Sequence, residues 1–491
     1  MTPEEEAKRL IAEYEAAQQD RRPIRTYADD QAGPDNKLYS DSGNAERLIA
    51  LADGKARYEP SWGLWLTWDG QRWTIDHSDL QAQELAKGIA AQLRTRSNET
   101  RNEKAQKALH NWSIRSENVH GITGTIKLAR SSPGIAISHT QLDDDPWTLN
   151  CQNGLLDLRT MILHAPNPDS LVTKLAGCAY DQAAPAPHFH QFLTDTFPDP
   201  EVLAYTQRYI GYCLTGDVTE QQISMWWGAG RNGKSTLINI VAAMLGDYAV
   251  TIGRDILIAQ KHESHDTKFV DLFRSRLAVC VELKETERLD ASRIKALTGG
   301  DTIMARRMRE NYWRFHPTHK LLVATNHKPR ADAKDFALWR RIHLVPFTKT
   351  VEETDVDPQL ANEIIANELP GVLAWAAQGC LEYQQHRLAA PKAVVDATQS
   401  YKNETDTVEQ FLTNCGIQAG PQVAGETSST AFRAAHDEWC EDAGENPRSH
   451  WNKVSAHLKQ EGCVNRRVHG GRLWSHVSMP GITQETTQYD R

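Results

Sequence analysis

The sequence of 491 residues lacks the features of a membrane or secreted protein. No apolar run reaches the roughly 18 residues that a membrane-spanning helix requires. The first residues, Met-Thr-Pro-Glu-Glu-Glu, do not form a secretory signal. We therefore expect a soluble, cytoplasmic protein without a membrane partner.

The sequence also lacks a recognisable cysteine pattern. None of its 8 cysteines forms a C-x-x-C pair, and none lies at zinc-finger spacing from a histidine. Scattered cysteines in a long chain indicate buried free thiols in a reducing compartment. The segment His262-Glu-Ser-His265 does not have the H-E-x-x-H spacing of a zinc motif. No metal other than Mg²⁺ is therefore indicated.

A basic excess is absent as well. The chain has 55 Lys and Arg against 64 Asp and Glu, which gives a net charge of -9 and excludes a basic nucleic-acid coat. Any contacts with nucleic acid must come from local patches or an internal channel. Hydrophobic content of 40% and charged content of 24% are ordinary for a globular protein, and the length predicts about three domains.

The clearest motif is Gly228-Ala-Gly-Arg-Asn-Gly-Lys-Ser235, which fits G-x-x-x-x-G-K-[ST]. It lies between an apolar run at 223–227 that predicts a strand and a run at 236–245 that predicts a helix ended by Gly246. This context predicts a phosphate-binding loop whose backbone N–H groups and helix N-terminus receive phosphate. Expected cofactors are ATP and Mg²⁺. Candidate nucleotide-binding residues are Gly228, Ala229, Gly230, Arg231, Asn232, Gly233, Lys234, Ser235 and Thr236.

Polar side chains at the ends of two further predicted strands complete this candidate site. We expect Lys234 to reach the β- and γ-phosphates and Ser235 to ligate Mg²⁺. Glu282 and Glu285 follow the predicted strand 276–281, and we assign Glu282 to the metal and Glu285 to the attacking water, although the roles can be reversed. Asn326 follows the predicted strand 320–325 and is the candidate for holding that water or the γ-phosphate; the alternative is an Asn turn.

Two arginines precede the next apolar run. Arg341 is the first candidate, and Arg340 the second, for an arginine that reaches the γ-phosphate of a neighbouring subunit. A surface ion pair is the alternative.

Two stretches are candidates for DNA binding. Strands at 302–308 and 312–315 predict a basic hairpin, suited to gripping a single strand, with Arg306, Arg307 and Arg309 as candidates; a sheet-edge hairpin with solvated arginines is the alternative. Helices at 408–414, 429–443 and 449–460, followed by a Gly-tipped hairpin at 462–474, predict a winged helix. There Lys453, Arg466 and Arg467 are the candidates, with His450 on the same helix; a protein-interaction domain is the alternative.

Before the motif, we expect a helix capped by Ser42 or Asn44, a Trp-rich hairpin at 62–75, helices within 78–117 and a strand-rich segment from Trp147 to Lys174. The hairpin tryptophans are read as packed core in preference to a base-stacking platform. The residues before 189 carry no Asp-x-Asp metal pair on a predicted strand.

The order of these motifs resembles the superfamily three helicases, specifically the phage and plasmid primase-helicases related to poxvirus helicase-primases. The close match covers about residues 195–350 and includes Leu297-Thr-Gly-Gly-Asp301 and Leu338-Trp-Arg-Arg-Ile342; a looser one covers about 45–195. The resemblance implies an α/β fold with an AAA+-type P-loop NTPase core, an α+β N-terminal domain and a winged-helix-like C-terminal domain. Predicted boundaries are 1–44 (helix and loop), 45–188 (α+β domain), 189–390 (motor with helical collar) and 391–491 (DNA-binding domain).

The resemblance further implies an ATP-dependent replicative helicase of a phage, plasmid or mobile element, in the host cytoplasm. It would form a homo-oligomeric ring, usually a hexamer, and move 3′ to 5′ along single-stranded or forked DNA, with a separate primase or polymerase as further partner. The alternatives are an ATPase that loads or remodels replication complexes and an origin-binding module that uses ATP as a switch.

Overall fold

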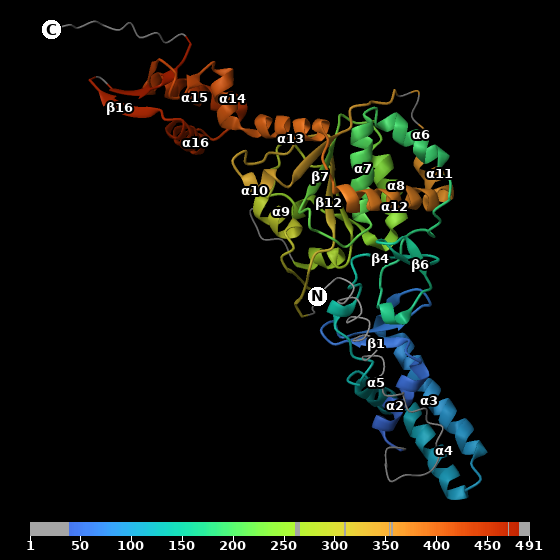
Figure 1. Ribbon diagram of the computed structural model, residues 1–491. Helices are drawn as coiled ribbons and strands as arrows, with labels where there is room; N and C mark the ends of the chain where they lie inside the picture. The colour runs from blue at the N-terminus through green and yellow to red at the C-terminus, as the bar shows by residue number, and fades with distance from the viewer. Residues whose placement is uncertain are drawn as a thin grey trace, which may run out of the picture.

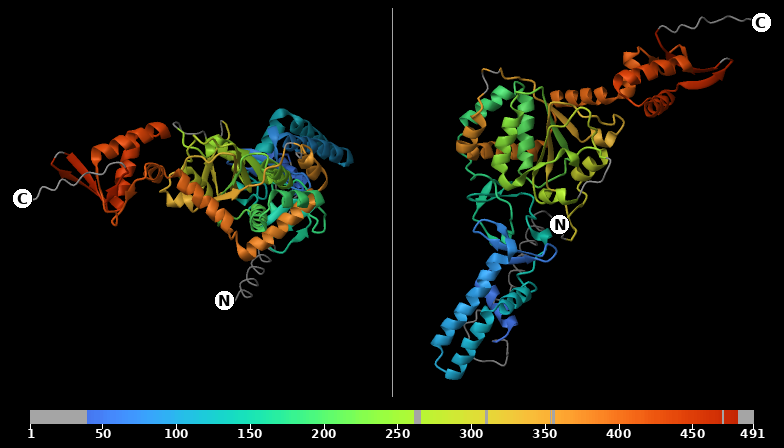
Figure 2. Two further views of the ribbon diagram at one scale, coloured as in Figure 1. Left: turned by 90° about the horizontal axis from the view of Figure 1, so that it is seen from above. Right: turned by 180° about the vertical axis from the view of Figure 1, so that it is seen from behind.

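The computed structural model describes residues 39–260, 266–308, 311–352, 354, 357–469 and 471–480. It shows a mixed α/β chain with three units arranged along an elongated molecule (Figures 1 and 2). An N-terminal unit lies at one end, a unit built on a parallel sheet lies in the middle, and a C-terminal unit projects to the side. The segment expected as an N-terminal helix and the tail beyond Pro480 lie outside the described residues.

The N-terminal unit joins a small antiparallel sheet, in the order β1-β2-β3, to a group of helices. Across the predicted hairpin Trp68 pairs with Trp73, and Trp65 and Trp73 are fully buried, which confirms that these two are core residues. Helix α2 begins earlier than predicted, because the hydroxyl of Ser40 accepts from the backbone N–H of Gly43 and caps it. The elements are α2 (Asp41–Ala52), β1 (Ala56–Glu59), β2 (Leu64–Trp68), β3 (Trp73–Asp76), α3 (Leu80–Glu99), α4 (Glu103–Glu117) and α5 (Val119–Ala129).

A second small sheet links this unit to the middle of the molecule. It consists of β4 (Thr148–Cys151), β5 (Gly154–Asp157) and β6 (Ile162–His164), with Cys151 opposite Gly154 across the predicted turn. The predicted strand-rich segment is therefore present, although its last residues, 171–174, form no strand; there the carbonyl of Val172 accepts the backbone N–H of Trp73.

The middle unit is organised by a parallel sheet of the order β13-β7-β12-β9-β8. From β7 the chain runs to β8 at one edge of the sheet. After β12 it runs in the other direction, past β7, to β13 at the opposite edge. In open α/β sheets such a reversal marks the ligand crevice at the carboxyl ends of the strands. The elements are α6 (Pro187–Thr196), α7 (Pro200–Cys213), β7 (Ile223–Trp227), α8 (Lys234–Leu245), β8 (Ala249–Ile252), β9 (Leu277–Val281), α9 (Ala291–Thr298), β10 (Ile303–Ala305), β11 (Trp313–Phe315), β12 (Lys320–Thr325), α10 (Phe336–Trp339), β13 (Ile342–Pro346), α11 (Leu360–Asn367) and α12 (Leu369–His386).

Both faces of this sheet are covered, which explains why its strands read as continuous apolar runs. All residues of β12 are buried. Leu322 and Ala324 belong to the core formed with α7, α8 and α12, whereas Leu321 and Val323 belong to a second core that includes Trp62 of the N-terminal unit. The N-terminal and middle units therefore share one continuous apolar interior.

The C-terminal unit follows α13 (Lys392–Thr405), a helix that precedes the first helix predicted for this domain (Figure 1). The predicted helices and hairpin are present, and β15, which was not predicted, adds a strand to give the order β15-β17-β16. The elements are α14 (Thr407–Asn414), β14 (Gln418–Ala419), β15 (Glu426–Ser428), α15 (Ser429–Ala443), α16 (Pro447–Gln460), β16 (Val464–Val468), β17 (Gly471–Ser475) and β18 (Val477–Ser478), which pairs with β14.

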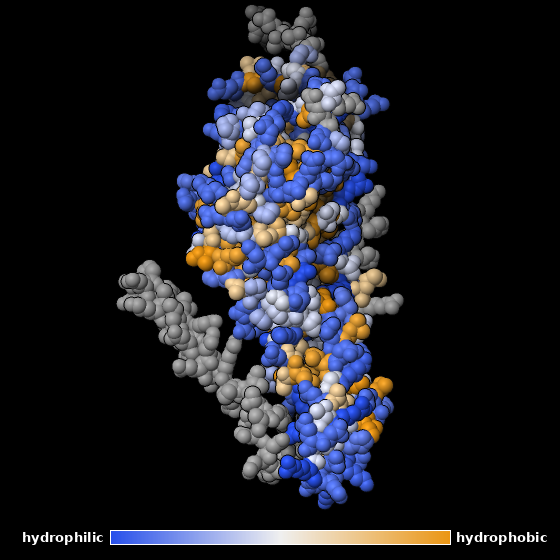
Figure 3. Space-filling view, turned by 90° about the vertical axis from the view of Figure 1, so that its right-hand side faces the viewer, coloured by the Kyte–Doolittle hydropathy of each residue, from blue (hydrophilic) through white to orange (hydrophobic). Residues whose placement is uncertain are grey.

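The surface carries no broad apolar band on the face shown in Figure 3, where hydrophobic patches are scattered over a mainly hydrophilic exterior. Within the described ranges, every helix is too short or too polar to cross a membrane. All eight cysteines lie in the described ranges and are free, and only Cys415 is partly exposed, which confirms the expectation of buried free thiols.

Candidate functional site

The loop from Gly228 to Gly233 joins β7 directly to α8 and has the backbone that its glycines permit. Gly230 has φ +106° and Gly233 has φ +78°, conformations that residues with a Cβ rarely adopt. A Cβ on Gly228 would lie 2.1 Å from Nδ2 of Asn232, and one on Gly233 would lie 2.8 Å from Oγ1 of Thr196 in α6. The loop is therefore a tight cradle of backbone, held from behind by α6.

The side chain of Lys234 lies inside this cradle. Its Nζ donates to the carbonyl of Gly228 at 2.7 Å and to Oδ1 of Asn232 at 2.9 Å, while Asn232 donates through Nδ2 to the carbonyl of Phe347 at 3.3 Å. Only 6% of Lys234 is exposed, and burial lowers the pKa of its ammonium to about 8. The ammonium group of Lys234 is therefore held within the loop by two acceptors that phosphate oxygens can replace.

The hydrogen-bond donors and the hydroxyl group at this loop fit a nucleoside triphosphate with Mg²⁺. The backbone N–H groups of the loop and the N-terminus of α8 suit phosphate oxygens. The exposed Ser235 lies in the first turn of α8 beside the half-buried Thr236, so its hydroxyl is open to a metal ion, and Arg231 and Ala229 are exposed on the outside of the loop.

The predicted acidic and amide residues lie at the same edge of the sheet. Glu282 directly follows β9 with φ +63° and donates its backbone N–H to the carbonyl of Ala324 at 2.9 Å. Glu285 and Asn326 line one cavity of about 770 Å³ together with Trp227, the last residue of β7. Both glutamates and Asn326 are exposed. The structure thus brings Glu285 and Asn326 together, and Glu282 is not among the residues that line this cavity.

The structure separates the two candidate arginines. Arg341 is 6% exposed, and its guanidinium donates to Thr298 Oγ1 at 3.1 Å, the carbonyl of Ala337 at 2.8 Å and Gln221 Oε1 at 3.2 Å. Arg340, in contrast, is exposed. In this fold Arg341 stabilises the junction before β13, and of the two arginines Arg340 is the one whose side chain is open to solvent.

The predicted basic hairpin is present but shorter than expected, with β10 paired to β11 so that Met304 lies opposite Arg314. The guanidinium of Arg306 stacks on Tyr312 at 4.8 Å, and Tyr312 is 49% exposed. The guanidinium of Arg307 instead lies 4.8 Å over the ring of Trp62. The candidate Arg309 lies outside the described residues.

The base of this hairpin is braced by the N-terminal unit. Trp62 contacts Trp313 and Phe273, with ring centroids 5.4 Å and 5.3 Å apart. Nε2 of His139 lies 2.9 Å from the carbonyl of Arg314, and its Nδ1 lies 3.1 Å from the buried carboxylate of Glu59. The hairpin is therefore anchored at β11 by side chains of the N-terminal unit.

The C-terminal candidates have different surroundings. Lys453 is exposed and lines the cavity of Glu285 and Asn326. Arg466 is exposed but pairs with Glu426 at 2.5 Å, whereas Arg467 lines a groove with Arg433 and Arg472. His450, named above as a residue of the same helix, is fully buried.

Sequence reasoning missed the contribution of α13 and the C-terminal unit to the cavity of Glu285 and Asn326. Because Trp227, the residue before the candidate nucleotide loop, also lines it, we name it the nucleotide-side cavity. Glu404, Thr407, Trp439 and Glu445 line it, and two ion pairs cross it, Lys328 with Glu404 at 2.7 Å and Arg330 with Glu445 at 3.3 Å. No local motif signals such contacts, since the partners are distant in the sequence.

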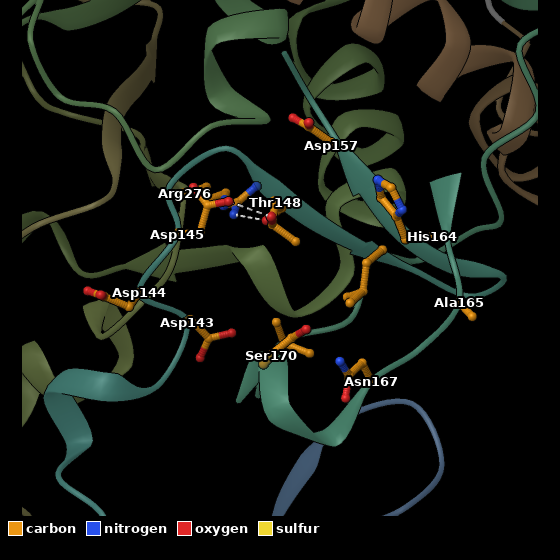
Figure 4. A pocket seen from close by; sticks show the side chains of 12 residues that line it. Asp143, Asp144, Asp145, Thr148, Asp157, His164, Ala165, Asn167, Ser170 and Arg276 are labelled. Atoms are coloured by element: carbon orange, nitrogen blue, oxygen red, sulfur yellow. Dashed lines mark hydrogen bonds between the residues drawn. The ribbon is translucent and has the colours of Figure 1, made fainter. Parts of the chain in front are cut away.

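A second cavity, of about 410 Å³, lies at the opposite edge of the sheet, beside Arg276 just before β9 (Figure 4). Its acids are already engaged: Asp145 accepts from Thr148 Oγ1 at 2.7 Å and Asp143 from the backbone N–H of Thr173 at 2.8 Å. The guanidinium of Arg276 donates to the carbonyls of Thr148 and Leu214. These contacts join the second small sheet to the middle unit.

Comparison with known proteins gives family matches over the N-terminal unit and over the middle unit. Residues 45–198 match the family described as "D5 N terminal like", and residues 226–341 match a family of unknown function (DUF5906). A solved structure, the apo C-terminal region of NrS-1, aligns with a TM-score of 0.48 and 11% identity over 88% of this chain and 97% of that chain.

Similar curated proteins come from large DNA viruses. A protein named "Putative helicase" of Acanthamoeba polyphaga mimivirus is 24% identical over 55% of this chain and 30% of its own length. Another of that name from Frog virus 3 is 26% identical over 52% of this chain and 28% of its own length. A "Putative primase" of African swine fever virus is 23% identical over 65% of this chain and 35% of its own length. The matched region is about a third of each relative, and these findings support a relationship with the D5-like viral primase-helicases.

Proposed function

We propose that this chain is an ATP-dependent DNA helicase that acts in the replication of a phage, plasmid, virus-like or other mobile element. The observation that carries the proposal is the cradle of Gly228–Gly233 around Lys234, at the same sheet edge as Glu285 and Asn326. A phosphate loop next to strand-end carboxylate and amide groups is the arrangement that nucleotide hydrolysis requires.

Each of these residues has a definable task. Lys234 neutralises the β- and γ-phosphates, and Ser235 together with Glu282 holds Mg²⁺. Glu285 polarises the attacking water and Asn326 orients it, since both face one cavity. When bound, ATP would supply the phosphoanhydride bond whose hydrolysis releases the energy for movement, and Mg²⁺ would neutralise the charge on its phosphates.

The core is of the AAA+ type and works as a ring, usually a hexamer. The exposed Arg340 is the arginine offered to a neighbouring subunit's γ-phosphate, because Arg341 is committed to internal partners. Such an arginine contributes on the order of a thousandfold or more to turnover when it is supplied in trans.

The hairpin β10–β11 is the element that follows single-stranded DNA, in the 3′ to 5′ direction. Tyr312 with the stacked guanidinium of Arg306 offers a base-stacking surface and a phosphate contact at one place. Met308, 79% exposed, extends the same tip. The anchored base at Trp62 gives this contact a rigid support from which to act on the strand.

The C-terminal unit acts as a winged-helix-like binder of duplex or forked DNA. Its groove is lined by Arg433, Arg467 and Arg472, so guanidinium groups from α15 and from the β16–β17 hairpin converge there. Contacts of this kind position a protein on phosphates. A separate primase or polymerase is the further partner that replication calls for, and the host cytoplasm is the place of action.

The runner-up function is an ATPase that loads or remodels replication complexes without unwinding. The docking of the C-terminal unit at the nucleotide-side cavity favours it, because Lys328–Glu404 and Arg330–Glu445 can transmit the nucleotide state to a binding domain. An origin-binding module that uses ATP only as a switch is a further possibility of the same architecture.

A strand-displacement assay separates these functions. The full chain with ATP and Mg²⁺ should unwind a duplex with a 3′ tail, and Lys234→Ala should abolish both unwinding and ATPase. DNA-stimulated ATPase without any displaced strand would support the loading ATPase. DNA binding and biological function that survive Lys234→Ala would support the switch.

A further inference from the structure

A cluster of metal-ligating side chains lies inside the C-terminal unit, away from the nucleotide loop. His436 and Cys440 are four residues apart on α15, so they share one face of that helix. His450 comes from α16, which packs against α15. All three side chains are fully buried.

The three candidate ligand atoms converge on one point. Nε2 of His436 lies 2.9 Å from Nδ1 of His450 and 3.4 Å from Sγ of Cys440, and that sulfur lies 3.7 Å from Nδ1 of His450. Zn–N bonds of about 2.0–2.1 Å and a Zn–S bond of about 2.3 Å at tetrahedral angles give N–N edges of about 3.3 Å and N–S edges of about 3.6 Å. The atoms already stand within about 0.4 Å of those edges.

A neighbouring carboxylate fixes the tautomer that binding needs. Nδ1 of His436 lies 3.0 Å from Oδ1 of Asp437, so Nδ1–H is donated outward and the lone pair of Nε2 points into the cluster. A carboxylate that receives the second ring nitrogen is the usual support of a metal-bound histidine.

Simple packing accounts for only part of this arrangement. A hydrogen-bonded pair of stacked rings, 17° from parallel, explains the contact between the two histidines. It does not explain why a sulfur lies close to both of the facing nitrogens, since a thiol has one proton to donate. A shared cation satisfies all three groups at once.

We propose that His436, Cys440 and His450 form a Zn²⁺ site that ties α15 to α16. Two imidazoles and a thiolate are the ligands that Zn²⁺ prefers, and the fourth tetrahedral position is left to water, as in other sites with three protein ligands. The site is independent of the proposed helicase activity.

The ion would set the position of α16 within the C-terminal unit. The exposed Lys453 lies one turn beyond His450 on α16, whereas Arg433 lies one turn before His436 on α15. Fixing the two helices to each other therefore fixes the spacing between these two cations. Trp439, whose ring centroid is 5.0 Å from that of His450, also lines the nucleotide-side cavity, so the metal site lies next to the docking surface of this unit.

The test uses the full chain, freed of metal by a chelator and then titrated with Zn²⁺ against a chromophoric competitor. We expect one Zn²⁺ per chain, and at least tenfold weaker binding in Cys440→Ser and in His450→Asn. The matched control is Cys463→Ser, which removes another buried thiol of the same unit and should bind Zn²⁺ as the unchanged chain does.

Cobalt substitution in the unchanged chain keeps the test valid if a variant fails to fold. Co²⁺ should give the intense visible bands of a tetrahedral site with a thiolate charge-transfer band in the near ultraviolet. The proposal is overturned if the unchanged chain retains no Zn²⁺ in the presence of the competitor, if Co²⁺ shows only octahedral bands, or if Cys463→Ser loses the metal as Cys440→Ser does.

Discussion

Alanine substitutions at the two neighbouring arginines before β13 should have opposite effects. Arg341→Ala removes a buried guanidinium that donates to Thr298, Ala337 and Gln221. Arg340→Ala removes an exposed side chain. We expect the first change to lower stability and the second to lower catalysis while stability is kept.

The magnitudes follow from the contacts. A hydrogen bond from a charged group contributes about 1.5–3 kcal/mol, and because one side chain makes all of these bonds their contributions do not add fully. We expect Arg341→Ala to cost about 3–4 kcal/mol, which lowers Tm by about 10 °C. Arg340→Ala should change stability by less than about 0.5 kcal/mol but reduce kcat by about a thousandfold or more.

Thermal unfolding followed by circular dichroism, and ATPase rates with nucleotide binding measured in parallel, provide the readouts. Mixing Arg340→Ala with Lys234→Ala should restore part of the turnover, since each variant supplies the group that the other lacks across a subunit interface. Arg101→Ala, an exposed arginine at the α3–α4 turn, should leave both readouts unchanged. If Arg341→Ala melts as the unchanged chain does and loses ATPase, while Arg340→Ala keeps it, the assignment made from burial is refuted.

Further perturbations test the loop and the hairpin. Burial lowers the pKa of Lys234 to about 8, and bound phosphate favours its charged form. Nucleotide affinity should therefore be constant below pH 8 and fall about tenfold per pH unit above it. In a titration from pH 7 to 9.5, Lys234→Arg should show no such fall in affinity. Gly233 has φ +78°, and the Cβ that Gly233→Ala adds would lie 2.8 Å from Thr196 Oγ1. This change should abolish nucleotide binding measured by fluorescence while the helical circular dichroism is retained. Unchanged affinity would contradict the tight loop geometry. Arg306→Ala should weaken single-strand binding and reduce the salt slope by about one; an unaltered slope would exclude a phosphate contact there.

The sequence was most informative where structure is local. The loop Gly228–Ser235 with its flanking strand and helix was predicted because the spacing of its glycine, lysine and hydroxyl residues directly specifies the loop between a strand and a helix. The continuous apolar run of β12 likewise identified a strand buried on both faces. The C-terminal helices and hairpin were predicted from periodicity and turn residues.

Orientation and long-range contact were not predictable in this way. Arg340 and Arg341 are consecutive, and only tertiary contacts with Thr298 and Gln221, which are distant in the sequence, decide which guanidinium is buried. The sequence placed His450 on the helix of the basic candidates, but not in the interior, where it meets His436 of α15. The spacing of His436 and Cys440 by one helical turn, with His450 ten residues later, was a sequence signal that a search for C-x-x-C pairs does not detect.

The central claim is that hydrolysis at Lys234 drives movement along a DNA strand. Its most direct test is the ATPase rate of the purified full chain with and without a single-stranded oligonucleotide, alongside its assembly state with ATP. The account predicts a multi-subunit assembly whose rate rises severalfold with the oligonucleotide and is abolished in Lys234→Ala. A monomer that hydrolyses ATP at the same rate in both conditions would contradict it.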